Sequence, residues 1–231
     1  EKESMESEAV HVYAQFRKQE VWEANNFQQI LSHYKGLENG LIIRDELKLF
    51  SNSIIGHETD HAQRVAFLTV PFSAMKALPV SDILVLLIGA MVHDIGRTWE
   101  NLSDTHHGEK SFNIFARALS SSVNDIEGFT NKLNNYIGNL SLNTEDCLML
   151  RHIVSIHSLE PSEKAIYREI HNLSNNQRFF ELFTILDDCD ALDRLRFRYN
   201  LNINFLNDPL AKRLIHYANK LNEEPNYRKD I

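Results

Sequence analysis

An uninterrupted apolar segment, Ile83 to Val92, constrains the fold of this chain more than any other feature. Its ten residues are about half of the roughly 20 that a bilayer-spanning helix requires, so the segment does not predict a membrane anchor. A helix that is apolar nearly all round has to be covered by other elements. We therefore expect a buried helix in the middle of the domain, capped by Ser81 or Asp82.

The remaining sequence favours helices and one large domain. The 231 residues include only 8 Gly and 5 Pro, which are few helix-breaking residues for a chain of this length. Folding can bury roughly 70% of the extended-chain surface at this size, so no disulfide framework is needed. Cys147 and Cys189 are far apart in the sequence and form no paired-cysteine metal motif. The sequence thus predicts an all-α domain, a helical bundle.

The spacing of apolar residues divides the chain into three regions. Residues 1–55 are expected to form an additional N-terminal helical segment packed on the core, residues 56–222 the main domain, and residues 223–231 a frayed tail. The expected helices cover about 6–34, interrupted near 25–26 and ended by a turn at 35–40, and then 41–55, 58–78, 83–92, 107–119, 122–138, 144–157, 162–171, 175–200 and 208–222.

The charge balance excludes some classes of partner. The formal net charge is −8, the opposite of the basic surface expected of a protein that holds duplex nucleic acid. The first residues lack the basic and then apolar stretch of a secretion signal, so we expect a cytoplasmic protein. The expected partner is a small molecule, with no membrane and no duplex nucleic acid, and a homo-oligomer stays open.

Histidines beside carboxylates mark the candidate site. His93 and Asp94 close the apolar segment, where a buried imidazole and a buried carboxylate must both find partners. A metal ion supplies a partner for both. His57 and His61 are four residues apart and Arg64 is three further on, so these side chains lie near one stripe of a helix.

Two further pairs of histidines follow. His106 and His107 stand at the expected start of a helix. His152 and His157 are five residues apart, which rotates their side chains by about 140° on an α-helix. Only one of this second pair can face a small site, and we expect it to be His157.

The last polar group lies at residues 187–196. Asp187, Asp190 and Arg194 share one stripe because they are three and four residues apart. We expect Asp187 and Asp193 to be charges on the helix surface, or partners of Arg194 and Arg196, and not metal ligands.

Taken in order, these groups resemble the signature of the HD-domain metal-dependent phosphohydrolase superfamily over residues 56–198. The resemblance rests on His61 with its following Arg-Val, on His-Asp-Ile-Gly after an apolar helix, and on Asp190 before Ala-Leu. It implies an HD-domain-like helical bundle. Many members carry two further histidines that create a second metal position. The resemblance therefore implies six ligands: His61, His93, Asp94, His107, His157 and Asp190.

The same resemblance implies an enzyme that cleaves a phosphoester or phosphoanhydride, in a nucleotide, by metal-activated hydroxide. Imidazole and carboxylate suit one or two divalent Mn, Fe, Ni, Co or Zn ions better than Ca. His93 and Asp94 are the catalytic pair, and Asp94 can bridge two ions. Four cationic side chains are candidates for binding substrate phosphate: Arg64, Arg97, Lys110 and Arg194.

Two alternatives remain. The sequence around His57 and the sequence around Cys189 also resemble the helical phosphodiesterase domains of bacterial effectors that process ADP-ribosylated ubiquitin. Those domains need no metal. On this alternative, Glu100 and Glu109 would be the residues to test. The protein would then be delivered into another cell. The other alternative is a non-catalytic HD module that binds a nucleotide and signals through residues 4–55.

Overall fold

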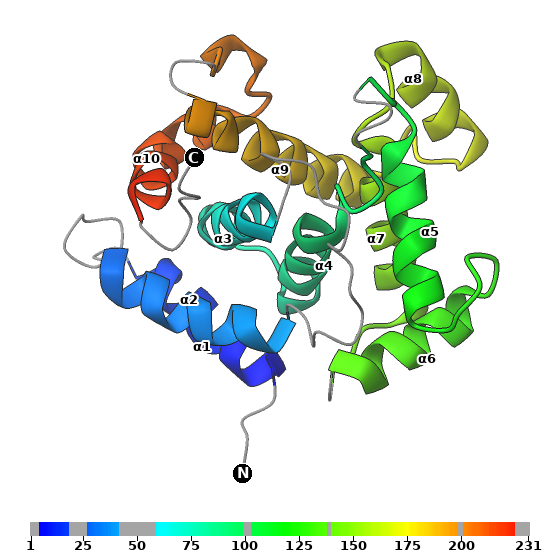
Figure 1. Cartoon of the computed structure of the whole chain (residues 1–231), viewed down its shortest axis with the longest axis horizontal. Coiled ribbons are helices and arrows are strands. Elements are labelled where there is room, and N and C mark those ends of the chain that lie inside the picture. Colours follow the sequence, from blue (N-terminus) through cyan, green and yellow to red (C-terminus); the bar gives the residue numbers. More distant parts are fainter. Residues whose placement is uncertain are drawn as a thin grey trace.

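The computed structural model describes residues 5–18, 27–41, 59–98, 103–137, 140–197 and 201–224, and every regular element in these ranges is helical (Figure 1). The predicted all-α class is thereby confirmed. The α-helices are α1 (Met5–Arg17), α2 (Phe27–Leu41), α3 (Thr59–Lys76), α4 (Val80–Val92), α5 (His107–Ala118), α6 (Ile126–Ile137), α7 (Thr144–Ile156), α8 (Pro161–Ile170), α9 (Gln177–Asp193) and α10 (Ile215–Glu223); 3-10 helices cover Arg194–Phe197, Ile203–Phe205 and Pro209–Leu214.

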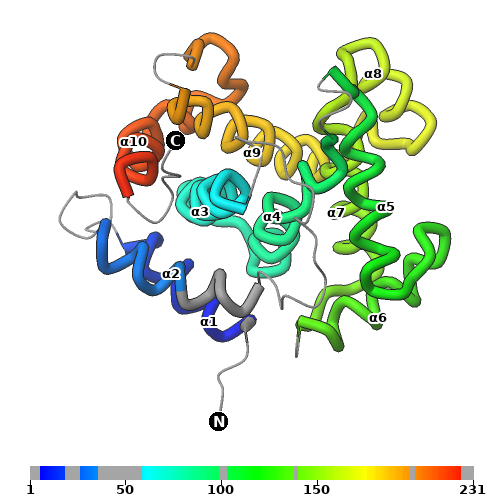
Figure 2. Tube along the Cα trace, in the orientation of Figure 1, coloured from blue at the N-terminus to red at the C-terminus, as the bar shows by residue number. Residues whose placement is uncertain are grey.

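The apolar segment forms the central helix, as predicted. Every residue of α4 from Asp82 to Val92 is buried, and α4 packs against α3, α7 and α9. In Figures 1 and 2, α3 and α4 lie in the middle, with α5, α6 and α7 on one side and α1 and α2 on the other. No helix of the described ranges is long and apolar enough to cross a membrane.

The expected cap of α4 is wrong. The helix begins before Ser81, and its N-cap is Pro79, in an extended conformation and without a side-chain cap. The carbonyl of Pro79 accepts the backbone N–H groups of Asp82 and Ile83 at 3.1 and 3.2 Å. The Asp82 carboxylate instead accepts two hydrogen bonds from Arg178 of α9, so it connects two helices.

The N-terminal helices share the core of the main domain. The ring of Phe67, in the middle of α3, is contacted edge to face by Phe16, Phe27 and Tyr34, with centroid distances of 5.6, 5.8 and 5.1 Å. All four side chains are buried. Because these rings come from α1, α2 and α3, the first two helices are part of one apolar core with the helix that carries His61.

Several predicted helix ends differ from the structure. The turn expected at 35–40 is wrong, because α2 continues through both glycines to Leu41; a glycine inside a helix costs only about 1 kcal/mol. The helix expected at 175–200 is shorter, since α9 ends at Asp193 and tightens into a 3-10 turn. The helix expected at 208–222 likewise starts as a 3-10 turn after Asp208. The helix expected at 41–55, except its first residue, lies outside the described residues, as does most of the tail.

Candidate metal centre

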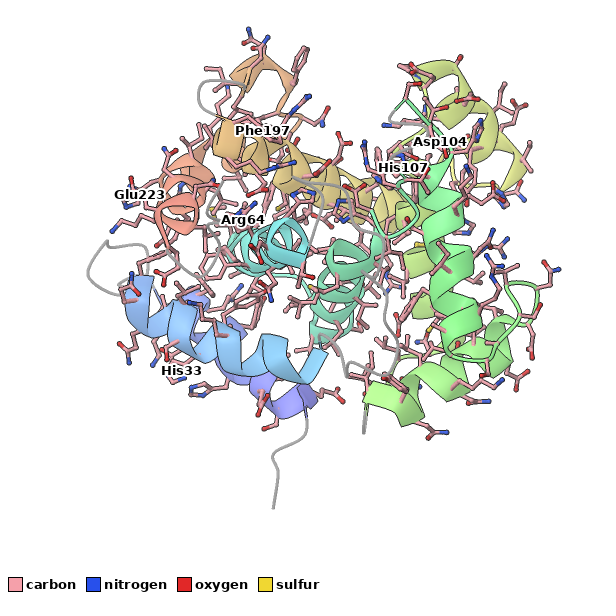
Figure 3. All side chains as sticks on the ribbon, viewed as in Figure 1. His33, Arg64, Asp104, His107, Phe197 and Glu223 are labelled. Carbon is pink, nitrogen blue, oxygen red and sulfur yellow. The ribbon has the colours of Figure 1, made fainter. Side chains whose placement is uncertain are left out.

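Six polar side chains from five helix ends meet beside α4. They are the six residues that the sequence singled out, although they are distant along the chain. His107 lies at the start of α5, as Figure 3 shows. The others are His61 in the first turn of α3, His93 at the C-cap of α4, Asp94 directly after it, His157 at the C-cap of α7 and Asp190 in the last turn of α9.

The carboxylate of Asp94 lies between two pairs of imidazoles. Its Oδ2 atom is 3.5 Å from Nε2 of His61 and 3.6 Å from Nε2 of His93. Its Oδ1 atom is 3.0 Å from Nε2 of His107 and 3.4 Å from Nε2 of His157. Each oxygen of one buried carboxylate therefore faces its own pair of ring nitrogens.

The two sides of Asp94 differ in charge. Oδ1 of Asp190 lies 3.2 Å from Nε2 of His61 and 3.7 Å from Nε2 of His93, so this side has a second carboxylate. The Asp190 side chain is 39% exposed, whereas that of Asp94 is 4% exposed. On the other side, the Nε2 atoms of His107 and His157 are 3.0 Å apart, and Asp94 is the one carboxylate of the described residues that both approach.

Three of the four imidazoles are oriented by the backbone. Nδ1 lies against the carbonyl oxygen three residues earlier, at 2.7 Å for His93, 2.6 Å for His107 and 2.7 Å for His157. A carbonyl oxygen only accepts hydrogen bonds, so Nδ1 carries the proton that it donates. The lone pair of each neutral ring is then on Nε2, which faces the centre.

His61 is oriented by a carboxylate instead. Its Nδ1 lies 2.7 Å from Oδ2 of Asp193, a residue that is only 1% exposed. The expectation that Asp193 is a surface charge is wrong, whereas its pairing with Arg196 is confirmed at 2.8 Å. Its spacing of three from Asp190 was the available signal, because residues three apart share one face of a helix.

The carboxylates set the protonation of this side. Burial lowers the pKa of His61, but three surrounding carboxylates outweigh burial and raise it to about 10. Burial raises the pKa of Asp190, but His61 and His93 hold it well below its usual range. On the other side, burial lowers the pKa of His157 to about 4, because Asp94 does not compensate for lost water and neighbouring imidazoles. One side thus has two carboxylates, whereas the other side includes His157, whose lowered pKa favours the neutral imidazole.

The donor atoms form two groups that could hold a metal ion. His61, His93 and Asp94 place three ligand atoms within 4.8 Å of one another, and Asp94, His107 and His157 do the same. Both groups combine imidazole with carboxylate, and both side-chain types are metal ligands. Nε2 of His93 is buried and has no hydrogen-bond partner among the described residues, which is costly unless another group occupies its lone pair. Each group could therefore hold a metal ion.

Two glycines allow the helix ends to meet. A Cβ on Gly108 would lie 2.3 Å from the carbonyl oxygen of Val154 and 2.8 Å from Nδ1 of His157. A Cβ on Gly96 would lie 2.5 Å from the carbonyl oxygen of His107. Any side chain at either position would therefore push α5 away from α7 or from the end of α4.

The four cations expected to bind phosphate lie in different surroundings. Arg97 is 25% exposed, and its Nε donates to Oδ1 of Asp94 at 3.0 Å. Arg64 is buried and donates to Asp193. Lys110 is exposed and paired with Asp104, and Arg194 is exposed at the end of α9.

The neighbouring histidines lie apart from the six. Nδ1 of His152 lies 3.1 Å from the hydroxyl of Tyr167, between α7 and α8, while His157 faces Asp94. His106 is exposed and lies 3.3 Å from Glu163. His57 and Glu100 are outside the described residues, and Glu109 is exposed on α5.

No family model matches this chain, and neither a curated protein nor a solved structure matches it.

Proposed function

We propose that this chain is an HD-type, metal-dependent phosphohydrolase or phosphodiesterase that cleaves a phosphoester or phosphoanhydride of a nucleotide. One observation carries the proposal: the Asp94 carboxylate lies between two pairs of imidazoles, with one oxygen toward each pair. A carboxylate shared in this way suits two ions a few ångströms apart, the arrangement common in enzymes of phosphate chemistry.

The residues divide into two ligand groups. His61, His93 and Asp190 would hold one ion and His107 and His157 the other, with Asp94 common to both. The ions would be Mn, Fe, Ni, Co or Zn. When bound, they supply Lewis acidity that polarises a phosphoryl oxygen and makes water more acidic at neutral pH.

Arg97 is the cation best placed to meet the substrate. Its guanidinium touches Asp94 through Nε and is partly exposed, so other N–H groups remain for a phosphate oxygen. A guanidinium beside the reacting group neutralises charge that develops on the phosphoryl oxygens. In this account Arg97 binds phosphate and orients Asp94 at the same time.

The proposal is tested by hydrolysis assays with nucleotides and simple phosphodiesters in the presence of each of the five metals. We expect turnover that requires metal, is lost on chelation and is abolished in His93→Ala. The matched control is His33→Ala, an exposed histidine on α2 far from α5 (Figure 3). It should retain wild-type turnover.

Two results would contradict the proposal. Chelator-resistant cleavage of an ADP-ribosylated protein would favour the metal-independent phosphodiesterase. Tight nucleotide binding without product, in protein loaded with metal, would favour the non-catalytic signalling module.

A further inference from the structure

The carboxylate of Asp193 is buried but strongly hydrogen-bonded. Arg64 donates to it twice, from Nε at 2.6 Å and from Nη2 at 3.1 Å. Arg196 donates from Nη1 at 2.8 Å. Asp193 is therefore a buried carboxylate that lies between two guanidinium groups.

This carboxylate distinguishes one imidazole from the other three. His93, His107 and His157 donate from Nδ1 to neutral backbone carbonyls, whereas His61 donates to Asp193. A carboxylate behind an imidazole fixes its orientation and makes its other nitrogen a better metal ligand. The His61 side of the centre thus has a support that the His107 side lacks.

We propose that Asp193 is a positioning residue for the metal ion held by His61, His93 and Asp190, and that Arg64 and Arg196 hold Asp193 in place. This inference rests on the proposed metal-dependent function. It assigns Arg64 to the support of the centre and not to substrate phosphate. It also makes the two metal positions unequal in their dependence on Asp193.

The two arginines have a chemical purpose in this arrangement. Asp193 accepts hydrogen bonds from both guanidinium groups as well as facing Nδ1 of His61. Each guanidinium supplies hydrogen bonds to lone pairs of Asp193 that His61 does not use. Asp193 is thereby held in one orientation behind His61.

The experiment is a titration of the metal-free full chain with Zn²⁺ alone, in which calorimetry measures the affinity. The His107→Ala substitution removes a ligand of the second metal position and leaves the position that contains His61. In this background we expect Asp193→Asn to weaken Zn²⁺ binding by about 10–100-fold. In a His61→Ala background, the same substitution should leave the remaining affinity unchanged. Glu181→Gln is the matched control, because it removes a partly exposed carboxylate of α9 that pairs with Lys76.

The outcomes separate the inference from the proposed function. No Zn²⁺ binding by the wild-type chain would overturn the proposed metal centre itself. Zn²⁺ binding that Asp193→Asn leaves unchanged, or weakens equally in both backgrounds, would overturn the inference alone. If Asp193→Asn does not fold, Arg64→Lys decides, since it keeps the charge but loses the two-point contact; unchanged affinity at the His61 position would then overturn the inference.

Discussion

Each imidazole of the candidate metal centre offers Nε2 to an ion only if its Nδ1 carries the proton. For His93, His107 and His157 this condition is local, because the acceptor is the carbonyl three residues earlier at a helix end. A sequence that places these residues at helix ends therefore comes close to predicting their orientation. For His61 the acceptor is Asp193, which lies far away in the sequence. The spacing of three from Asp190 places Asp193 on the same face of α9, but it does not by itself pair Asp193 with His61.

Arg97 yields the first prediction at this scale. Replacing it with Met removes charged hydrogen bonds worth about 1.5–3 kcal/mol, so we expect kcat/KM for a phosphodiester to fall roughly 10–100-fold. Arg97→Lys should restore only part of this loss, because Lys lacks the planar fork. Steady-state kinetics measure the effect. Arg117→Met, at the exposed far end of α5, serves as control, and equal losses in both variants would refute the assignment.

At the scale of elements, the centre depends on how closely α5 approaches α7. The first turn of α5 lies against the last turn of α7 with no room for a side chain at Gly108. The glycine is visible in the sequence, but its reason is not, because the crowding atoms belong to residues 154–157 of another helix. Here the residues that form each helix could be predicted from the sequence, whereas the contacts between the helices could not.

Gly108→Ala tests this packing. The added methyl meets the Val154 carbonyl, so we expect a loss of about 1–3 kcal/mol in the free energy of unfolding, together with weaker metal binding at His107 and His157. Gly128→Ala in α6 is the matched control, since its methyl meets the Asp125 side chain, which can move. For Gly128→Ala, urea denaturation should show a change below about 1 kcal/mol in the free energy of unfolding. Similar losses in both variants would contradict the account.

The contact between α7 and α8 makes the stability of the folded chain depend on pH. Burial, with His171 and Arg151 nearby, lowers the pKa of His152 to about 4 in the folded chain, against 6.5 when unfolded. As the pH falls, His152 therefore takes up a proton in the unfolded chain before it does so in the folded chain. The free energy of unfolding is lost as the pH falls from about 6.5 to 4. We expect His152→Gln to remove up to about 3 kcal/mol of that loss. Urea unfolding of both proteins at pH 7 and pH 4.5, without metal, measures the difference, and parallel losses would contradict the prediction.

At the scale of the whole molecule, the buried apolar helix is what brings the centre together. Because α4 must be covered on all sides, α3, α7 and α9 pack around it and carry their polar ends to His93 and Asp94. Composition and the apolar segment sufficed to predict the all-α class, whereas the six residues that meet were predicted from the sequence resemblance. The convergence of Arg64 and Arg196 on Asp193 was not predictable, since the two arginines come from different elements.

The central claim, that this cluster binds metal, is tested most directly by elemental analysis of protein purified without chelator. We predict one or two equivalents of Mn, Fe, Ni, Co or Zn in the wild-type chain and in His33→Ala, and a large loss in His93→Ala at unchanged helical content. Absence of metal from folded wild-type protein, even after incubation with each of the five ions, would contradict the account.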